Sequence, residues 1–329
     1  MRSAFGEVFD VPAGYLNTAG IGVPPASAAT AVTERVARWA SGADGPDAVE
    51  PHVAAARAAF GRLVGVPADR VAVGASVAQL VALVAASVPE GTSVLVAEGE
   101  FTSLTFPFAA RGLRITEVPL ESIAAEAPRH DLVAVSVVQS ADGRVVDLDG
   151  LRAAGVPVLL DATQAVGWMP LSLDWADWVV AACYKWLLAP RGAAWLAGRA
   201  SALDGTRAVT ANWYGGEDPW ATVYGLPLRS AADARRLDLS PVWLSQYGAA
   251  VTLPWLASLD LGAVRDHCVG LADVVRERVG IPLGGSPIVA LPVASLPGVR
   301  ASVRAGRVRI GFHLYNTLED VQLVLKALE

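Results

Sequence analysis

The sequence contains few cysteines and no long apolar run. These two absences argue against a disulfide-stabilised protein and against a membrane-spanning one. Cys183 and Cys268 are the only cysteines among 329 residues, too few for a disulfide framework and consistent with a reducing cytoplasm. Hydrophobic residues make up 53% of the chain, yet no run reaches the roughly 18 apolar residues of a membrane span. Residues 1–16 lack a basic start followed by an apolar core. We therefore expect a cytoplasmic protein with no signal peptide and no membrane partner.

An excess of positive charge is also missing. The chain has 26 Lys and Arg against 32 Asp and Glu, a formal net charge of −6, and no lysine tracts. This balance argues against nucleic acid as a partner. At 329 residues the chain exceeds what one core usually organises, so we expect a large domain and a smaller one.

Lysine occurs only at positions 185 and 326, and arginine supplies the other basic side chains. Lys326 lies near the C-terminus on a predicted exposed helix. Lys185 lies in the most apolar stretch, DWVVAACYKWLLAPRG (177–192). Loss of hydration there lowers the pKa of an amine and makes it a nucleophile. Arginine replaces lysine as a charge but not as an amine nucleophile, so a coding bias toward arginine makes Lys185 more informative.

Short apolar runs alternate with alanine-rich helical stretches. The expected helices are Pro25–Ser41, Pro51–Leu63, Val77–Ser87 and Leu104–Arg111. The expected strands are Val71–Gly74, Ser93–Ala97, Arg114–Val118, Leu132–Val138, Pro157–Leu160, Trp178–Ala182 and Ala193–Ala197. This alternation predicts an α/β fold with a mostly parallel, seven-stranded sheet sandwiched by helices.

The pattern changes after about Leu244. TLED (317–320) predicts a capping box at the start of a closing helix. Before it we expect a helical stretch over Gln246–Val279 and strands at Ile288–Val293, Arg300–Arg304 and Val308–Phe312. The predicted organisation is an N-terminal segment over 1–20, a large domain over 21–243 and a small α+β domain over 244–329.

Several predicted strands are followed by residues suited to ligand binding. The turn GASVAQ (74–79) opens a helix whose N–H groups can bind phosphate, although Ser76 alone is equally an ordinary N-cap. Phe101 follows the next strand and can stack on a flat ligand, although alone it would be read as a core residue. Gln139 begins a polar turn, QSADG (139–143). Asp161 ends a buried strand, where an acid needs a partner.

Strand ends of a parallel sheet gather ligands at one edge. A phosphate cradle, an aromatic platform, a buried acid and Lys185 are therefore predicted together. Pyridoxal 5′-phosphate uses all four, with the lysine forming the Schiff base and an anion pairing with the pyridinium nitrogen. We prefer this hypothesis to the alternative of Asp161 as a helix cap and Lys185 as a snorkelling surface residue. No metal site is predicted.

The chain resembles the class V aminotransferase-like family of fold-type I pyridoxal-phosphate-dependent enzymes over nearly its whole length. Three motifs carry the resemblance: DATQAVG (161–167), YKWLLAPRG (184–192) and VRIGFHLYNTLED (308–320). The QSADG turn and the HLYNTLED ending look most like the ergothioneine-type C–S lyase branch of that family.

The resemblance implies roles around the cofactor. The family lysine that matches Lys185 forms the internal aldimine, and the aspartate that matches Asp161 pairs with the ring nitrogen. Gln164 matches the residue that hydrogen-bonds the phenolic oxygen. Phe101 matches the aromatic position over the ring, where phenylalanine stacks but carries no proton. The implied phosphate-binding residues are Ala75, Ser76, Val77 and Tyr184.

The resemblance also implies substrate and partner contacts. Arg309 matches the arginine that grips the substrate α-carboxylate as a bidentate fork. YLNTAGIG (15–22) matches the segment that lines the substrate pocket, with Asn17 as the principal contact. Tyr15 and Gln139 are further expected substrate-binding residues.

Members of the family are homodimers with active sites at the interface. The resemblance therefore implies that ANWYGG (211–216) and RRLDLSP (235–241) approach the neighbouring subunit's cofactor, with Trp213 as a cofactor contact.

The family chemistry leaves several reactions open. The substrate is expected to be an amino acid or a cysteine S-conjugate, processed through an external aldimine and a quinonoid after Lys185 removes the α-proton. We favour β-elimination, a C–S lyase reaction, with a class V aminotransferase or an epimerase as the alternative. A desulfurase of this family needs a mobile cysteine, and Pro297–Val308 contains none. Kynureninase-like hydrolysis fits NWYG (212–215) but not DATQ (161–164).

Two other classes of protein fit the sequence less well. A non-catalytic cofactor-binding homologue would have lost the lysine, the acid or the arginine, and all three are present. A nicotinamide dehydrogenase fits the alternating strands and helices, but the first strand lacks the glycine-rich fingerprint of the expected spacing.

Overall fold

Seven strands form the central sheet of the computed structural model, which describes residues 1–329. The strands are β3 (Val71–Gly74), β4 (Ser93–Ala97), β5 (Arg114–Val118), β6 (Leu132–Ser136), β7 (Val158–Asp161), β8 (Trp178–Ala182) and β9 (Ala194–Gly198). Their order in space is β3-β9-β8-β7-β6-β4-β5. Neighbouring strands are parallel except at β9, which runs antiparallel to both β3 and β8. The predicted α/β fold with a mostly parallel seven-stranded sheet is confirmed.

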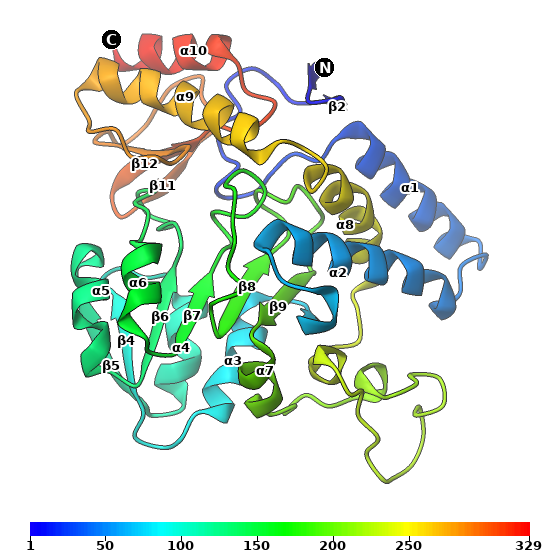
Figure 1. Cartoon of the computed structure of the whole chain (residues 1–329). Helices are drawn as coiled ribbons and strands as arrows, with labels where there is room; N and C mark the ends of the chain where they lie inside the picture. Colours follow the sequence, from blue (N-terminus) through cyan, green and yellow to red (C-terminus); the bar gives the residue numbers. More distant parts are fainter.

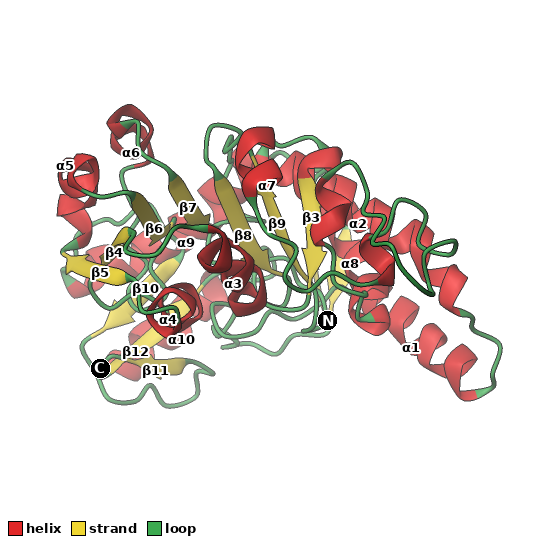
Figure 2. Cartoon of the chain, turned by 90° about the horizontal axis from the view of Figure 1, so that it is seen from below, coloured by secondary structure: helices red, strands yellow, loops and turns green.

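The sheet is covered on both faces, which explains why its strands are buried apolar runs, apart from the largely exposed edge strand β5. Leu160 of β7 belongs to the largest core cluster, whereas its neighbour Leu159 belongs to a second cluster. The first cluster includes residues of α2 (Glu50–Val64), α5 (Ile123–Glu126), α6 (Leu148–Ala154) and α8 (Trp243–Leu256). The second includes residues of α3 (Val77–Ser87), α4 (Thr102–Ala110) and α7 (Ala200–Gly205). Helices flank the sheet in Figure 2.

A separate small sheet lies beside the C-terminal helices. It consists of β10 (Ile288–Leu291), β11 (Ser302–Arg304) and β12 (Arg307–Gly311) in the order β10-β12-β11. A third core cluster joins it to α9 (Leu261–Val279) and α10 (Leu318–Leu328). These elements form the top layer in Figure 1, near both chain termini. The capping box predicted at Thr317 and Asp320 is present.

The helical stretch predicted over 246–279 is two helices, α8 and α9, interrupted at residues 257–260. The interruption has a local cause, because the Asp260 carboxylate accepts hydrogen bonds from Gly262 N–H and Ala263 N–H and begins α9. Helix α8 packs against α2 and α1 (Ala26–Ala40), whereas α9 packs against α10. The predicted division of domains at 243/244 stays a prediction, and this packing favours placing the divide between the two helices.

The N-terminal segment links the small sheet to the strand end at β8. After the hairpin of β1 (Arg2–Ala4) and β2 (Glu7–Phe9), residue Asn17 pairs with Gly311 as an isolated bridge. Gly22 N–H donates to the carbonyl of Tyr184 at 2.9 Å. A Cβ at position 22 would lie 2.0 Å from the Lys185 carbonyl oxygen, so only glycine permits this close approach.

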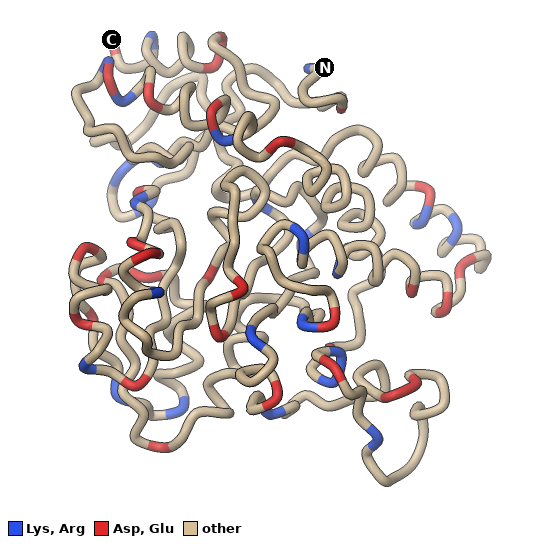
Figure 3. The backbone as a smooth tube through the Cα atoms, in the orientation of Figure 1, with Lys and Arg blue, Asp and Glu red and all other residues tan.

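Charged residues are distributed over the outer elements. Figure 3 shows acidic and basic positions interspersed along the outer helices and loops rather than gathered by sign. No helix combines the length and the apolar character needed to cross a membrane.

Candidate active site

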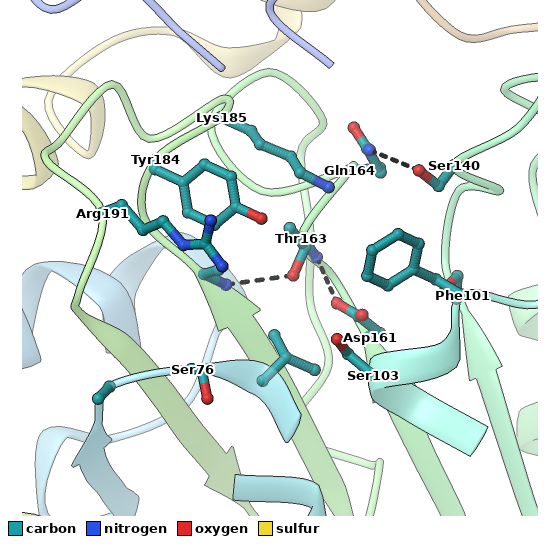
Figure 4. A pocket seen from close by; sticks show the side chains of 14 residues that line it. Ser76, Phe101, Ser103, Ser140, Asp161, Thr163, Gln164, Tyr184, Lys185 and Arg191 are labelled. Carbon is teal, nitrogen blue, oxygen red and sulfur yellow. Dashed lines mark hydrogen bonds between the residues drawn. The ribbon is translucent and has the colours of Figure 1, made fainter. Parts of the chain in front are cut away.

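A cavity lies where the carboxyl ends of β6, β7 and β8 meet the N-termini of α3 and α4. Parallel strands bring residues far apart in sequence to this one edge. Figure 4 shows the side chains pointing into it. The lining residues are Ala75, Ser76, Val77, Phe101, Ser103, Ser136, Ser140, Asp161, Thr163, Gln164, Ala182, Tyr184, Lys185 and Arg191.

Lys185 extends into the cavity between two aromatic rings. Its Nζ lies 5.3 Å from the centroid of the Phe101 ring and 5.7 Å from that of Tyr184. The residue is only 6% exposed, and this burial lowers the pKa of the amine to about 8, although the Asp161 carboxylate opposes the shift. The amine forms no salt bridge or hydrogen bond. An unpaired amine with a lowered pKa is a nucleophile near neutral pH.

Asp161 ends β7 in the same cavity. Thr163 N–H donates to its Oδ1 at 2.8 Å. Burial raises the pKa of this carboxyl, while the hydrogen bonds from Thr163 and the charge of Lys185 pull it down. A buried acid of this kind is stabilised as an anion when a cationic group binds beside it.

The cavity residues fit pyridoxal phosphate. Lys185 and Asp161 line one cavity without forming an ion pair, which leaves space between an amine and an acid for an aldehyde-bearing ring with a basic nitrogen. Phe101 supplies an aromatic face beside the amine. In the first turn of α3, the N–H groups of Val77 and Ala78 have no hydrogen-bond partner and are free to bind an anion.

The predicted phosphate turn lies at the start of α3. Ser76 is the N-cap, and its Oγ accepts a hydrogen bond from Gln79 N–H at 3.3 Å. Ala75 N–H donates to the Gln79 side chain at 3.3 Å. No acidic residue occupies the first turn, so nothing there repels an anion. The structure brings this turn and Tyr184 into the cavity, and their phosphate-binding roles remain proposals.

Gln164 lies at the cavity with its amide fully engaged. Its Nε2 donates to the Ala19 carbonyl at 3.0 Å and to Ser140 Oγ at 3.1 Å. Its Oε1 accepts from Trp186 Nε1 at 2.6 Å. These bonds fix the side-chain orientation, and its predicted contact with the phenolic oxygen remains a proposal.

Arg309 reaches the rim of the site from β12. It is fully buried, and its Nη1 donates to the Ser140 carbonyl at 2.5 Å and to Ser140 Oγ at 3.0 Å. Burial lowers the pKa of the guanidinium to about 10. Its Nε has no hydrogen-bond partner, and neither has the buried Oδ1 of Asn17 on the neighbouring segment. A buried guanidinium with a free donor suits a carboxylate, which is the role we propose for Arg309.

Five predicted site residues lie outside the cavity lining: Arg309 and Asn17, described above, and Tyr15, Gln139 and Trp213. Tyr15 donates its hydroxyl to the Ile21 carbonyl at 2.7 Å. Gln139 donates from Nε2 to Glu100 at 2.9 Å beneath the strand ends. Trp213 packs against Tyr214 and Trp220, with ring centroids 5.4 and 5.2 Å away. Their roles at the cofactor or substrate stay predictions.

The structure adds cavity residues that sequence reasoning passed over. They are Ser103, Ser136, Ser140, Thr163, Ala182 and Arg191. Most lie within motifs already recognised, such as Thr163 in DATQ and Arg191 in YKWLLAPRG, so position in a motif was the available signal. The sequence gives no such signal for Ser136, because it is the last residue of an apolar strand. In the structure its N–H and its hydroxyl donate to the Glu100 carboxylate at 2.9 and 2.5 Å.

The sheet, the cavity at its carboxyl edge and the lysine–acid pair define a pyridoxal-phosphate-dependent enzyme of fold type I. The chain belongs to the class V aminotransferase family, whose family model matches residues 48–280. The resemblance seen in the sequence is thereby confirmed at the level of the family. Pyridoxal phosphate is its cofactor.

Three named relatives match this chain over 61% to 81% of its length. An uncharacterized aminotransferase, YcbU, of Bacillus subtilis (strain 168) is 26% identical over 81% of this chain and 80% of its own length. An isopenicillin N epimerase of Streptomyces clavuligerus is 28% identical over 66% of this chain and 56% of its own length. A probable cysteine desulfurase of Pseudomonas putida is 29% identical over 61% and 59%. The names of these three relatives describe three different reactions.

Solved structures support the fold. The cysteine desulfurase CsdA of Escherichia coli matches with a TM-score of 0.80 and 19% identity, covering 97% of this chain and 95% of that one. A cystine C-S lyase, C-DES, matches with a TM-score of 0.83 and 17% identity, covering 96% and 97%. At these identities the likeness speaks for the fold alone.

Proposed function

We propose that the protein is a C–S lyase that cleaves a cysteine S-conjugate, or a related amino acid, by β-elimination. The observation that carries the proposal is the unpaired amine of Lys185, which lines the cavity with a pKa lowered to about 8. Bound pyridoxal phosphate would supply an aldehyde for the substrate amine and an electron-withdrawing ring that makes the α-proton acidic.

Substrate orientation is assigned to the rim of the cavity. The Arg309 guanidinium has an unpaired Nε, which we assign to the substrate α-carboxylate, with Asn17 beside it. Ser140, which already accepts from Arg309 Nη1, would fix the arginine in this position. The Cα–H bond of the substrate would then face the Lys185 amine.

Proton transfer is assigned to Lys185. Its neutral amine takes the α-proton, the electrons of the Cα–H bond form the Cα–Cβ double bond, and the sulfur leaves Cβ with the electrons of the C–S bond. A thiolate is a stable leaving group and needs no second acid. Hydrolysis of the remaining three-carbon unit gives pyruvate and ammonia.

Asp161 and Phe101 are assigned supporting roles. The Asp161 carboxylate would hold a proton on the ring nitrogen and so favour electron withdrawal from the substrate. The Phe101 ring, 41% exposed, lies with its centroid 5.3 Å from the amine and would stack on the cofactor ring without carrying a proton. Lys185, with its pKa lowered to about 8, is the base that β-elimination requires.

The two thiols argue against desulfurase chemistry. Both cysteines are fully buried, and the Cys183 Sγ donates to the Pro190 carbonyl at 2.9 Å. Burial raises the pKa of Cys183 to about 12 and also raises that of Cys268, so neither forms a thiolate readily. A class V aminotransferase remains the second candidate, because the relative YcbU, which matches 81% of the chain, is named an uncharacterized aminotransferase.

Absorption spectra and product analysis test the proposal. Purified protein loaded with pyridoxal phosphate is expected to show a visible band, and borohydride followed by peptide mass analysis should locate the reduced cofactor on Lys185. Lys185→Ala should lose the band, while Lys326→Ala, on α10, should keep it. Cysteine S-conjugates should give pyruvate and ammonia without added keto acid. Strict dependence on a keto acid would instead establish an aminotransferase.

A further inference from the structure

Arg191 is a cavity residue whose role the lyase mechanism does not explain. Three charged residues line the cavity: Asp161, Lys185 and Arg191. The first two have roles as the acid and the amine. The guanidinium of Arg191 has neither a hydrogen bond nor a salt bridge, and its Cζ lies 5.2 Å from the centroid of the Tyr184 ring. Arg191 is exposed, so its guanidinium is hydrated in the free protein and is available to an anionic group that enters the cavity.

The backbone around Arg191 is held in place, so its position is a feature of the fold. Its carbonyl accepts a hydrogen bond from Ser245 Oγ at 2.8 Å. Gly192 follows with a φ of +129°, and a Cβ there would lie 2.6 Å from Ser245 Oγ. Pro190 precedes it, and its carbonyl accepts from Cys183 Sγ at 2.9 Å. Contacts on both sides therefore present the arginine to the cavity.

Arg191 faces the side of the cavity that contains the predicted phosphate turn at the start of α3. Figure 4 shows its guanidinium beside Tyr184, on the side of the cavity where Ser76 lies, and away from Phe101 and Asp161. The other lining side chains at the starts of α3 and α4 include Ser76, Val77 and Ser103, all of them uncharged. A phosphate of charge near −2 therefore has helix N–H groups and hydroxyls available, and Arg191 is the one cation not already assigned to the amine chemistry.

We propose that Arg191 binds the phosphate group of the cofactor and completes the phosphate site formed by Ala75, Ser76 and Val77. The Tyr184 ring supports the guanidinium through a cation–π contact. The proposal rests on the pyridoxal-phosphate site and not on which reaction follows. Its failure would therefore leave the lyase assignment standing, and an aminotransferase outcome would leave this proposal standing.

A comparison of two ligands isolates the phosphate contact. Apo-protein is titrated with pyridoxal phosphate and with pyridoxal, which has the aldehyde but no phosphate, and the visible band is measured. Arg191→Gln should weaken pyridoxal phosphate binding about tenfold or more and leave pyridoxal binding unchanged. Arg191→Lys should recover part of the loss, because it restores the charge without the fork.

Controls separate a ligand contact from a structural role. Arg62→Gln, at an exposed position near the end of α2, should behave as wild type toward both ligands. Thermal unfolding of the apo-protein should be the same for Arg191→Gln and wild type. Equal weakening of both ligands would overturn the proposal in favour of a packing role. Unchanged pyridoxal phosphate affinity together with a raised KM for the amino acid would overturn it in favour of a substrate-carboxylate contact.

Discussion

Burial sets the chemistry of individual residues in this protein. Lys185 and Asp161 share a cavity, and burial shifts both pKa values toward the neutral form. For the amine, that shift increases the fraction able to attack an aldehyde at neutral pH. For the acid, the protonated ring nitrogen of the bound cofactor offsets the free-energy cost of burying the carboxylate charge. The same physical effect therefore prepares one residue for attack and the other for binding.

The pKa of Lys185 predicts how cofactor loading depends on pH. Only the deprotonated amine attacks the aldehyde, so the rate of covalent loading should rise about tenfold per pH unit at low pH. Because burial lowers this pKa from 10.5 to about 8, the rise should level off near pH 8. Stopped-flow absorption after mixing apo-protein with pyridoxal phosphate measures the rate.

A free lysine derivative provides the reference for that experiment. Its loading rate should continue to rise until the pH approaches 10.5, the ordinary pKa of the amine. A protein profile that rises in parallel with the reference would show that Lys185 is not desolvated before the cofactor binds.

At the scale of elements, a buried ion pair joins two segments far apart in sequence. Arg57 of α2 donates from Nη1 and Nη2 to the two carboxylate oxygens of Asp238 at 3.0 and 2.6 Å. Asp238 Oδ1 also accepts from Val73 N–H of β3 at 2.8 Å. This pair holds the 235–241 segment, which we expect to approach the neighbouring subunit's cofactor, against the edge of the sheet.

Breaking this pair should destabilise the fold strongly. Arg57→Met removes the guanidinium and leaves the Asp238 carboxylate buried without its partner, at a cost of about 3–5 kcal/mol in the free energy of unfolding. Chemical denaturation measures the loss. The double variant Arg57→Met with Asp238→Leu should recover part of it, because no charge is then buried.

A surface pair provides the matched control. Arg129 and Glu126 are joined at 2.6 Å, but the arginine side chain is 72% exposed. Arg129→Met should therefore change the free energy of unfolding by about 0.5 kcal/mol or less. A similar small effect for Arg57→Met would mean that the buried pair contributes little and that other contacts hold the segment.

At the scale of the whole molecule, one loop exposes an unusual amount of apolar surface. Between η5 (Trp213–Gly215) and α8, Tyr224 and Leu226 are 91% and 92% exposed, and Leu228 is 65% exposed. This loop extends from the body of the protein at the lower right of Figure 1. Clustered apolar residues of this kind mark an interaction surface. We propose that they contribute to a homodimer interface.

Charge on this loop should separate the subunits. The combined variant Leu226→Asp and Leu228→Asp is expected to sediment as a 34.1 kDa monomer, whereas wild type should sediment at twice that mass. Its turnover should fall as well, because the 211–216 and 235–241 segments would no longer reach a second subunit's site. Analytical ultracentrifugation measures the mass of each protein.

An exposed leucine elsewhere tests whether the effect is specific to this loop. Leu283 is 61% exposed and lies between α9 and β10. Leu283→Asp should keep the mass of wild type. A monomeric wild-type protein that retains full turnover would contradict both the dimer and the sharing of active sites.

The sequence alone determined the parts of this protein that depend on local pattern. The strands β3, β4, β5 and β8 have their predicted bounds, because short runs of β-forming residues between helices specify strands. Lys185 was identified by its rarity and its apolar setting. Asp161 was identified as an acid at the end of a buried strand, and both lie in the cavity.

The tertiary structure decided what depends on contacts between distant segments. The reversed direction of β9 follows from its pairing with β3 and β8, which no local pattern encodes. The hydrogen bonds from Arg309 to Ser140 join residues 169 positions apart. Arg191 lines the cavity because the backbone of its loop accepts a hydrogen bond from Ser245 of α8. Each of these contacts depends on which segments pack together, and packing is settled only when the whole chain buries its apolar surface.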